Sequence, residues 1–152
     1  MNIHYVVFRY KPDLRKDDWI PLGLVAERHI GENETEAAVV CLKNLDIDEK
    51  DEFMGAILRN IADFLRRGVE RSRAELLPRQ DLLEKLRDQH KRNFHFSVSR
   101  EATVEHDALL PAAHDLFGKE VLQILSARGL LSPSPQRATI HPQGLEMYRV
   151  AV

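Results

Sequence analysis

The chain has 152 residues, of which 43% are hydrophobic and 30% are charged. A chain of this length and apolar content can bury about two thirds of its unfolded surface in one core, so we expect a single domain. The 22 basic and 24 acidic side chains nearly cancel, which excludes a global field that would draw the chain onto nucleic acid or an acidic membrane.

Cysteine content and hydropathy indicate the compartment. The only cysteine, Cys41, lies in the apolar run 37–42, where a small thiol packs like an aliphatic side chain. A single cysteine excludes an internal disulfide and suits a reducing environment. The sequence opens with no charged-then-apolar leader, and no apolar run approaches the roughly 20 residues that span a bilayer. We therefore expect a soluble cytoplasmic protein with no membrane partner.

The first third of the chain predicts three strands in a meander. Residues 4–11 carry apolar side chains at both even and odd positions, which is typical of a central strand. Residues 19–26 form the second β-rich run, in which Pro21 and Gly23 indicate an edge position or a bulge. Residues 36–42 are rich in valine and small side chains and complete the meander.

Helices alternate with one further strand after the meander. Asp48 is a suitable N-cap for an amphipathic helix that ends near Gly68, and residues 82–91 predict a shorter helix. Residues 94–98 alternate between apolar and polar, so they predict a half-buried strand that pairs with the meander. A last helix is predicted between Asp107 and Gly129. The fold class is therefore α+β, with an antiparallel sheet of about four strands covered by about three helices.

The C-terminal part has a different character. Residues 1–130 make up the predicted domain, and residues 131–152 are a Pro/Ser linker followed by a strand-like tail. A terminal strand needs an edge to pair with. It can return to its own sheet or add to the sheet of a second copy, which predicts a homodimer through the C-terminal tail as one alternative.

Two stretches carry a resemblance to a known family. The opening pattern Arg9-Tyr-x-Pro-Asp13 and the later stretch 94–104 are similar to the bacterial family catalogued as domain of unknown function 3037. The matched pieces frame about the first four fifths of the chain. The resemblance implies a fold in which the late strand and a closing helix follow the hairpin. It also implies an accessory role, because family members are encoded beside HipA-like kinases.

A protein-interaction role is the function that we expect, with an unidentified protein partner and a HipA-like kinase as one candidate. Arg9 projects on the odd-numbered side of its strand, and Arg100 follows the late strand, so adjacent strands would let the two guanidiniums flank an anion or a partner's carboxylate. Salt bridges within the chain are the alternative. The interaction candidates are Arg9, Asp13, Asp18, Trp19, Arg100 and Tyr148.

Two functions of other classes are also considered. Asp13, Asp17 and Asp18 could hold a divalent ion and activate water in a metal-assisted hydrolase, although aspartates also favour solvated turns. Residues 59–92 hold ten basic against six acidic side chains, a local excess that could bind nucleic acid. The basic candidates there are Arg59, Arg66, Arg67, Arg71 and Arg73.

No catalytic signature, cofactor or metal site is predicted. The sequence has no Gly-rich phosphate loop, nucleophile elbow or paired-cysteine pattern, and its histidines lack the spacing of helical metal pairs. A partner role predicts an exposed apolar patch or an open sheet edge without a deep pocket. A hydrolase predicts instead a cleft lined by carboxylates with shifted pKa values.

Overall fold

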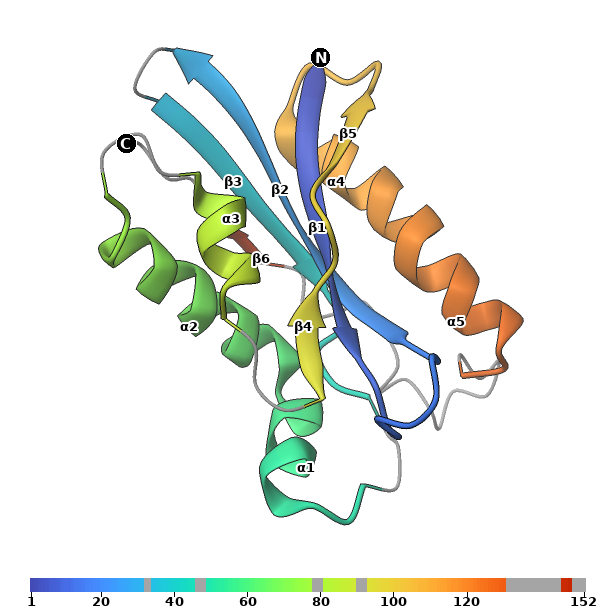
Figure 1. Cartoon of the computed structure of the whole chain (residues 1–152). Coiled ribbons are helices and arrows are strands. Elements are labelled where there is room, and N and C mark those ends of the chain that lie inside the picture. The colour runs from blue at the N-terminus through green and yellow to red at the C-terminus, as the bar shows by residue number, and fades with distance from the viewer. Residues whose placement is uncertain (32–33, 46–48, 78–80, 90–92, 131–145, 149–152) are drawn as a thin grey trace.

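A computed structural model describes residues 1–31, 34–45, 49–77, 81–89, 93–130 and 146–148, and these form an α+β fold around one antiparallel sheet (Figure 1). The strands are β1 (Asn2–Tyr10), β2 (Ile20–Gly31), β3 (Glu34–Cys41), β4 (Phe94–Phe96), β5 (Arg100–Thr103) and β6 (Glu146–Tyr148). The helical elements are α1 (Glu52–Arg59), α2 (Ile61–Ala74), α3 (Leu82–Arg87), α4 (Leu109–Phe117), the π-helical turn η1 (Gly118–Leu122) and α5 (Gln123–Ala127).

The strands are ordered β4-β1-β2-β3-β6, and β5 pairs with the other half of β1. The predicted meander, the central place of the first strand and its pairing with the late strand are confirmed. The second strand is bulged, which was one of the two predicted alternatives: Phe8 pairs with Gly23 and Arg9 pairs with Pro21, so Leu22 is an extra residue between these pairs. The edge position is wrong for β2, since it lies between β1 and β3.

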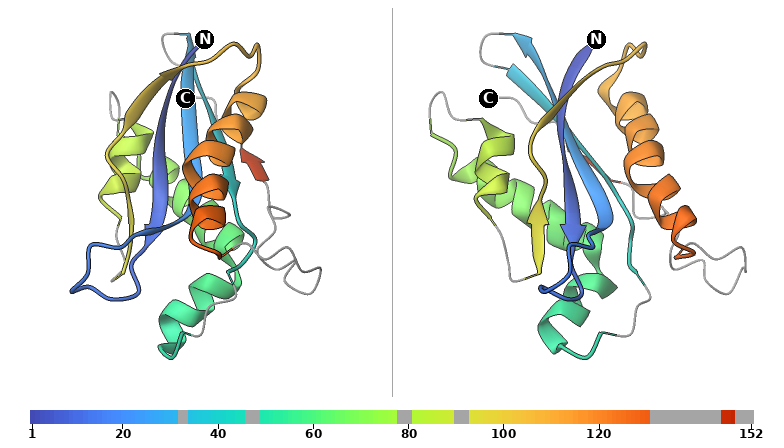
Figure 2. Two further views of the ribbon diagram at one scale, coloured as in Figure 1. Left: turned by 90° about the vertical axis from the view of Figure 1, so that its right-hand side faces the viewer. Right: turned by 45° about the vertical axis from the view of Figure 1, so that its right-hand side comes forward.

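Helices cover both faces of the sheet, so the fold has three layers (Figure 2). On β1, Phe8 contacts the ring of Phe64 in α2, whereas the hydroxyl of Tyr5 bonds to Glu120 in η1. Because side chains three positions apart on a strand point to opposite faces, α1 to α3 lie on one face and α4 to α5 on the other. The sequence predicted about three covering helices and did not assign them to the two faces.

An aromatic cluster fills the layer between the sheet and α2. The ring of Phe8 lies 5.4 Å from Phe64, 5.8 Å from Phe94 and 5.1 Å from Phe96, measured between centroids. The rings come from segments that are far apart in the sequence, and Phe8 is only 1% exposed. Each such ring removes a large apolar area from water, and its contacts fix where α2 and β4 lie against β1.

The first predicted helix is two helices. The N-cap of α1 is Asp51, whose carboxylate accepts from the Met54 N–H at 3.1 Å, while Asp48 lies outside the described residues. The chain breaks at Asn60, which caps α2 by accepting from the Asp63 N–H at 3.3 Å. The predicted end at Gly68 is wrong, because α2 continues to Ala74. One helical glycine costs only about 1 kcal/mol, which packing can exceed.

The last predicted helix is present from α4 to α5, with two corrections. Its N-cap is Ala108 and not Asp107, and it makes no side-chain cap bond. The π-helical turn adds one residue and rotates the side chains that follow it around the helix axis, and Ile124 is 36% exposed. Gly129 ends the helix with φ of 69°, a left-handed conformation that glycine adopts without cost.

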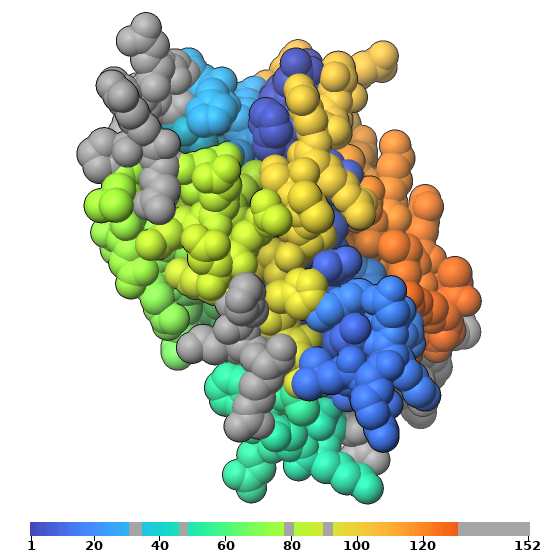
Figure 3. All heavy atoms as spheres, viewed as in Figure 1, coloured from blue at the N-terminus to red at the C-terminus, as the bar shows by residue number. Residues whose placement is uncertain are grey.

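One edge of the sheet is formed by two short strands with a break between them. The predicted strand 94–98 ends at Phe96, because Ser97 accepts the Val7 N–H with its hydroxyl at 2.9 Å and the chain departs from β1 before β5 begins. This segment lies at the surface between α3 and the layer of α4 and α5 (Figure 3). A short and interrupted edge is poorly suited to pairing with a further strand.

The other edge carries the tail. β6 pairs antiparallel with β3 of the same chain, with Ala37 opposite Tyr148. The predicted linker at residues 132–135 and the ends of the tail strand lie outside the described residues. A homodimer through the tail therefore stays a prediction, and the return of the tail to its own sheet is the pairing that the structure contains.

Candidate functional site

The sheet register brings four side chains together at one end of β1. Arg9 is the cross-strand partner of His95, and Tyr10 is the partner of Ile20. Trp19, which precedes Ile20, therefore lies next to Lys11 on the face opposite to Tyr10. We call Arg9, Lys11, Trp19 and His95 the cation–aromatic cluster. It belongs to the sheet face that α4 and α5 cover farther along, over β2 and β3.

The tryptophan ring is the centre of the cluster. The Cζ atom of Arg9 and the Nζ atom of Lys11 each lie 4.8 Å from its centroid. The ring of His95 meets it edge to face, with centroids 3.7 Å apart and planes at 79°. A cation over a tryptophan contributes about 0.5–1 kcal/mol at exposed sites and more when water is excluded. The ring is thus held by contacts on several sides while part of its surface stays accessible.

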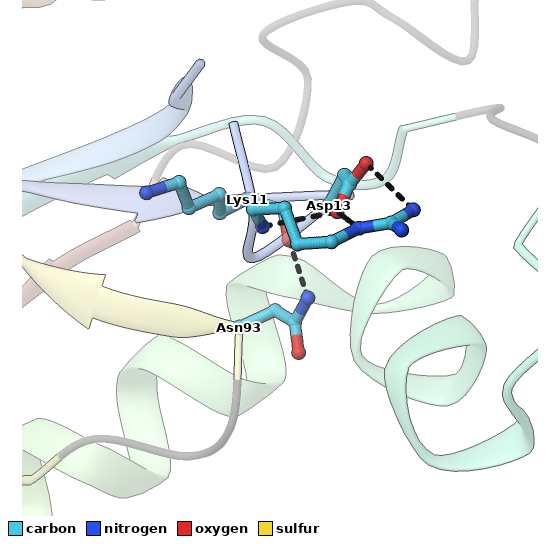
Figure 4. A network of polar contacts seen from close by, with 4 residues as sticks. Lys11, Asp13 and Asn93 are labelled. Carbon is cyan, nitrogen blue, oxygen red and sulfur yellow. Dashed lines mark hydrogen bonds and ion pairs between the residues drawn. The ribbon is translucent and has the colours of Figure 1, made fainter. Parts of the chain in front are cut away.

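The main chain of the turn is held from both sides. Arg128, just beyond α5, donates to the carbonyl oxygen of Trp19 at 2.7 Å and pairs with Asp18 at 2.8 Å. On the other side, the backbone N–H of Lys11 donates to the backbone oxygen of Asn93 at 2.9 Å. The side-chain amide of Asn93 donates in turn to the backbone oxygen of Lys11 at 2.5 Å (Figure 4). Two elements distant in sequence therefore fix the position of the cluster, which is what a preorganised binding site requires.

The cluster has an excess of partly buried positive charge. The Nε atom of Arg9 is buried and has no hydrogen-bond acceptor among the described residues. Burial lowers the pKa of the Arg9 guanidinium, Arg100 lowers it further, and Asp17 acts in the opposite direction. The Lys11 side chain is 15% exposed, and its carboxylate at 3.8 Å belongs to Asp17, which is 94% exposed. A solvated carboxylate screens these two cations only weakly.

Arg100 lies beside the cluster but is already engaged. It pairs with Glu120 of η1 at 2.9 Å, and Glu120 also accepts from the hydroxyl of Tyr5 at 3.0 Å. Burial raises the pKa of Tyr5, and the bond to Glu120 adds to the shift. Arg100 is therefore paired with a carboxylate of its own chain, whereas Arg9 has no paired carboxylate within the described ranges. The prediction that both guanidiniums flank one ligand anion thus has support only at Arg9.

The acidic turn does not gather its carboxylates. Asp13 accepts from Arg15, which lowers the pKa of Asp13, Asp17 faces Lys11, and Asp18 pairs with Arg128. Each carboxylate is neutralised by a different cation. Within the described part of the chain, no three His, Cys, Asp or Glu side chains are placed to hold a metal ion. The turn is a solvated connection, and the geometry gives the hydrolase alternative no support.

The arginines of α2 lie on its solvated side, mixed with acids. Asp63 pairs with Arg66 at 2.8 Å and with Arg67 at 3.0 Å, so it neutralises the middle of the predicted basic patch. Glu70 lies on the same exposed side as Arg71. Interleaved carboxylates oppose a phosphate backbone, so α2 lacks the continuous basic track of a nucleic-acid interface.

The described residues also form a hollow and expose some large apolar side chains. One shallow hollow is lined by Arg28, Glu36 and Leu109, and its two charged residues pair with each other at 2.6 Å. The exposed large apolar side chains include Leu14 in the turn that leads to Trp19 and Val98 in the break between β4 and β5. No helix in the described ranges has the length and apolar character needed to span a bilayer.

Comparisons with known proteins add no identification: no protein-family model, no curated protein and no solved structure matches the chain. The resemblance to the family of domain of unknown function 3037 thus remains a proposal drawn from the sequence.

The sequence analysis identified Arg9 and Trp19 as interaction candidates, but it did not identify Lys11 and His95. Lys11 reads as a turn residue, and His95 reads as the polar member of a half-buried strand. The alternation around His95 indicates which face it shares with its own strand, but only the register with β1 places it opposite Arg9. Tyr148 lies in β6 at the far edge of the sheet, so it does not join the cluster.

Proposed function

We propose that this protein is a cytoplasmic protein-interaction module that docks a partner on the cation–aromatic cluster. The observation that carries the proposal is the partly accessible Trp19 ring between two cations, one of which has a buried donor without an acceptor among the described residues. Tryptophan and arginine are the side chains that most often dominate the binding energy of protein interfaces. A HipA-like kinase is the candidate partner that the family resemblance implies.

The neighbouring surface favours a side-chain contact over strand addition. The edge at β4 and β5 is short, broken and charged, since Arg100 and Glu101 lie on it. Such an edge resists pairing with an added strand. A partner that meets the cluster instead gains contact with a preorganised ring and pays little entropy to order it. Val98 supplies exposed apolar surface on the edge segment that flanks the cluster in sequence.

Affinity capture from the native host tests the proposal. The tagged full chain, Trp19→Ala and the control Leu14→Ala serve as baits, and mass spectrometry quantifies the proteins that co-purify. We expect a partner to be retained by the full chain and by Leu14→Ala, and to be reduced about tenfold or more by Trp19→Ala, as for a binding hot spot. Far-ultraviolet circular dichroism checks that each bait is folded. Equal recovery by folded Trp19→Ala would overturn the proposal, whichever protein is captured.

A further inference from the structure

We infer that the cation–aromatic cluster binds a carboxylate from an acidic peptide segment, with Arg9 as the residue that receives it. This inference rests on the proposed function and names the chemistry of the partner. It starts from an imbalance: two partly buried cations, Arg9 and Lys11, face one carboxylate, that of the nearly fully exposed Asp17. Two positive charges against one negative charge leave an excess of one.

Buried arginine N–H groups normally have hydrogen-bond acceptors, because a buried donor without one has lost its hydrogen bond to water and gained none in the protein. On the same sheet face, Arg100 has an acceptor from within the protein. Arg100 donates to a carboxylate oxygen of Glu120 at 2.9 Å, and that carboxylate also accepts from Tyr5. Arg9 has no equivalent within the residues that the structure describes, so a ligand carboxylate would complete at Arg9 the pairing that Arg100 already has.

The charge and shape of the cluster favour a carboxylate over a nucleic-acid phosphate. A guanidinium donates two parallel hydrogen bonds to a planar carboxylate, and a single negative charge matches the excess of one. Carboxylates also lie nearby, those of Asp13, Asp17 and Asp18 along the turn and that of Glu101 on the adjacent edge strand, although each of them faces a basic side chain. A polyanionic strand would have to run past these carboxylates, whereas a short peptide with one well-placed acidic side chain would not.

The cluster contains its own reporter. Trp19 is the only tryptophan in the chain, and the Arg9 guanidinium lies against its ring. A carboxylate that binds Arg9 changes the charge next to the indole, so tryptophan fluorescence follows binding at this site alone. Arg15 provides a matched control, because it lies in the turn that follows β1, carries the same charge as Arg9 and is 90% exposed while paired with Asp13.

The test is a fluorescence titration of the full chain with three probes. They are a pentapeptide with one central glutamate, a valine on each side of it and blocked ends, the same peptide with glutamine in place of the glutamate, and a ten-nucleotide oligothymidylate. We expect saturable binding of the acidic peptide, and about tenfold weaker binding of the neutral one, because a charge-assisted pair is lost. Arg9→Gln should weaken the acidic peptide to a similar degree, and Arg15→Gln should leave its affinity within about twofold.

A second measurement does not depend on a substitution. In a nitrogen–proton correlation spectrum of the unaltered chain, the Nε–Hε signal of Arg9 should shift on addition of the acidic peptide and not of the glutamine peptide. Equal affinity for the two peptides, or an unmoved Arg9 signal at saturation, would overturn the inference. Tighter binding of the oligonucleotide than of the acidic peptide would overturn it in favour of a nucleic-acid ligand.

The two proposals fail in different ways. Suppose that partner capture depends on Trp19, but that the acidic peptide does not bind or binds Arg9→Gln as tightly as the unaltered chain. The proposed docking of a partner is then supported, and the inferred binding of a carboxylate at Arg9 is wrong. If the acidic peptide binds through Arg9 but no partner is lost with Trp19→Ala, the site binds carboxylates and the protein-docking function is wrong.

Discussion

The carboxyl groups of Glu27 and Asp81 are joined by a hydrogen bond between β2 and the start of α3. Glu27 is 1% exposed in the middle of its strand, and Asp81 caps α3 by accepting the Leu83 N–H at 3.2 Å. Burial, together with the smaller effects of the hydrogen bond to Asp81 and of its charge, raises the pKa of Glu27 to about 9. Glu27 is therefore protonated at neutral pH, so its hydroxyl donates to the Asp81 carboxylate.

This pair predicts that stability decreases as pH rises. The pKa of Glu27 is about 9 in the folded chain and 4.5 when unperturbed, so between these values the unfolded chain has lost a proton that the folded chain keeps. The contribution of Glu27 is fully present below about pH 4.5 and is lost progressively up to about pH 9, at a slope of up to about 1.4 kcal/mol per pH unit. Urea unfolding between pH 5 and 9, followed by circular dichroism, measures this slope.

Glu27→Gln should flatten the profile, because glutamine donates to Asp81 without carrying a proton that can be lost. The variant should unfold at higher urea than the unaltered chain at pH 8. Glu101→Gln is the control, since Glu101 shares the cross-strand partner His4 but is 60% exposed. The same slope in Glu27→Gln and in the unaltered chain would show that Glu27 is not the group responsible.

Phe8→Ala should be strongly destabilising. The Phe8 ring touches three other phenylalanine rings and is 1% exposed, so its removal leaves a cavity between the sheet and α2. We expect a loss of about 3–5 kcal/mol in the free energy of unfolding, measured by urea denaturation. Leu14→Ala, at a side chain that is 64% exposed, should change stability by no more than about 0.5 kcal/mol. Comparable effects of the two substitutions would contradict the assigned core.

Gly23→Ala tests how closely β2 approaches β3 and α2. A Cβ atom at this position would lie 2.7 Å from Cβ of Cys41 and 2.9 Å from Cδ1 of Leu65. Because the nearest of these atoms belongs to a neighbouring strand, we expect a loss of about 1–3 kcal/mol in thermal or urea unfolding. Gly118→Ala meets no atom within 4 Å, so it should be neutral or stabilise by up to about 1 kcal/mol. Equal tolerance at both positions would argue against this packing.

Deleting residues 131–152 tests where the tail strand pairs. If β6 belongs to its own sheet, the full chain should sediment as a monomer, and the truncated chain should associate through the exposed edge of β3, which holds the buried run Ala37–Cys41. Sedimentation velocity of both forms decides this. A full chain that is dimeric and a truncated chain that is monomeric would show instead that the tail is exchanged between copies.

Much of the fold could be predicted because it is local. The two-residue period of residues 94–98 and the mixed apolar character of residues 4–11 predict the strands, the faces of their side chains and the side of β1 on which Arg9 lies. Helix ends were less secure. Asp48 and Asp107 are acceptable caps in isolation, but Asp51 and Ala108 occupy those positions, because packing of the helices against the sheet decides where each first turn begins.

The sequence by itself determined the fold class, the meander, the late strand that joins it and the membership of Arg9 and Trp19 in a candidate surface, since these follow from side-chain period and residue type. Only the tertiary structure decided that helices cover both faces, that His95 lies opposite Arg9 and that Glu27 meets Asp81. These are contacts between residues tens of positions apart, and the register that creates them is fixed by the burial of the whole core, which no local pattern contains.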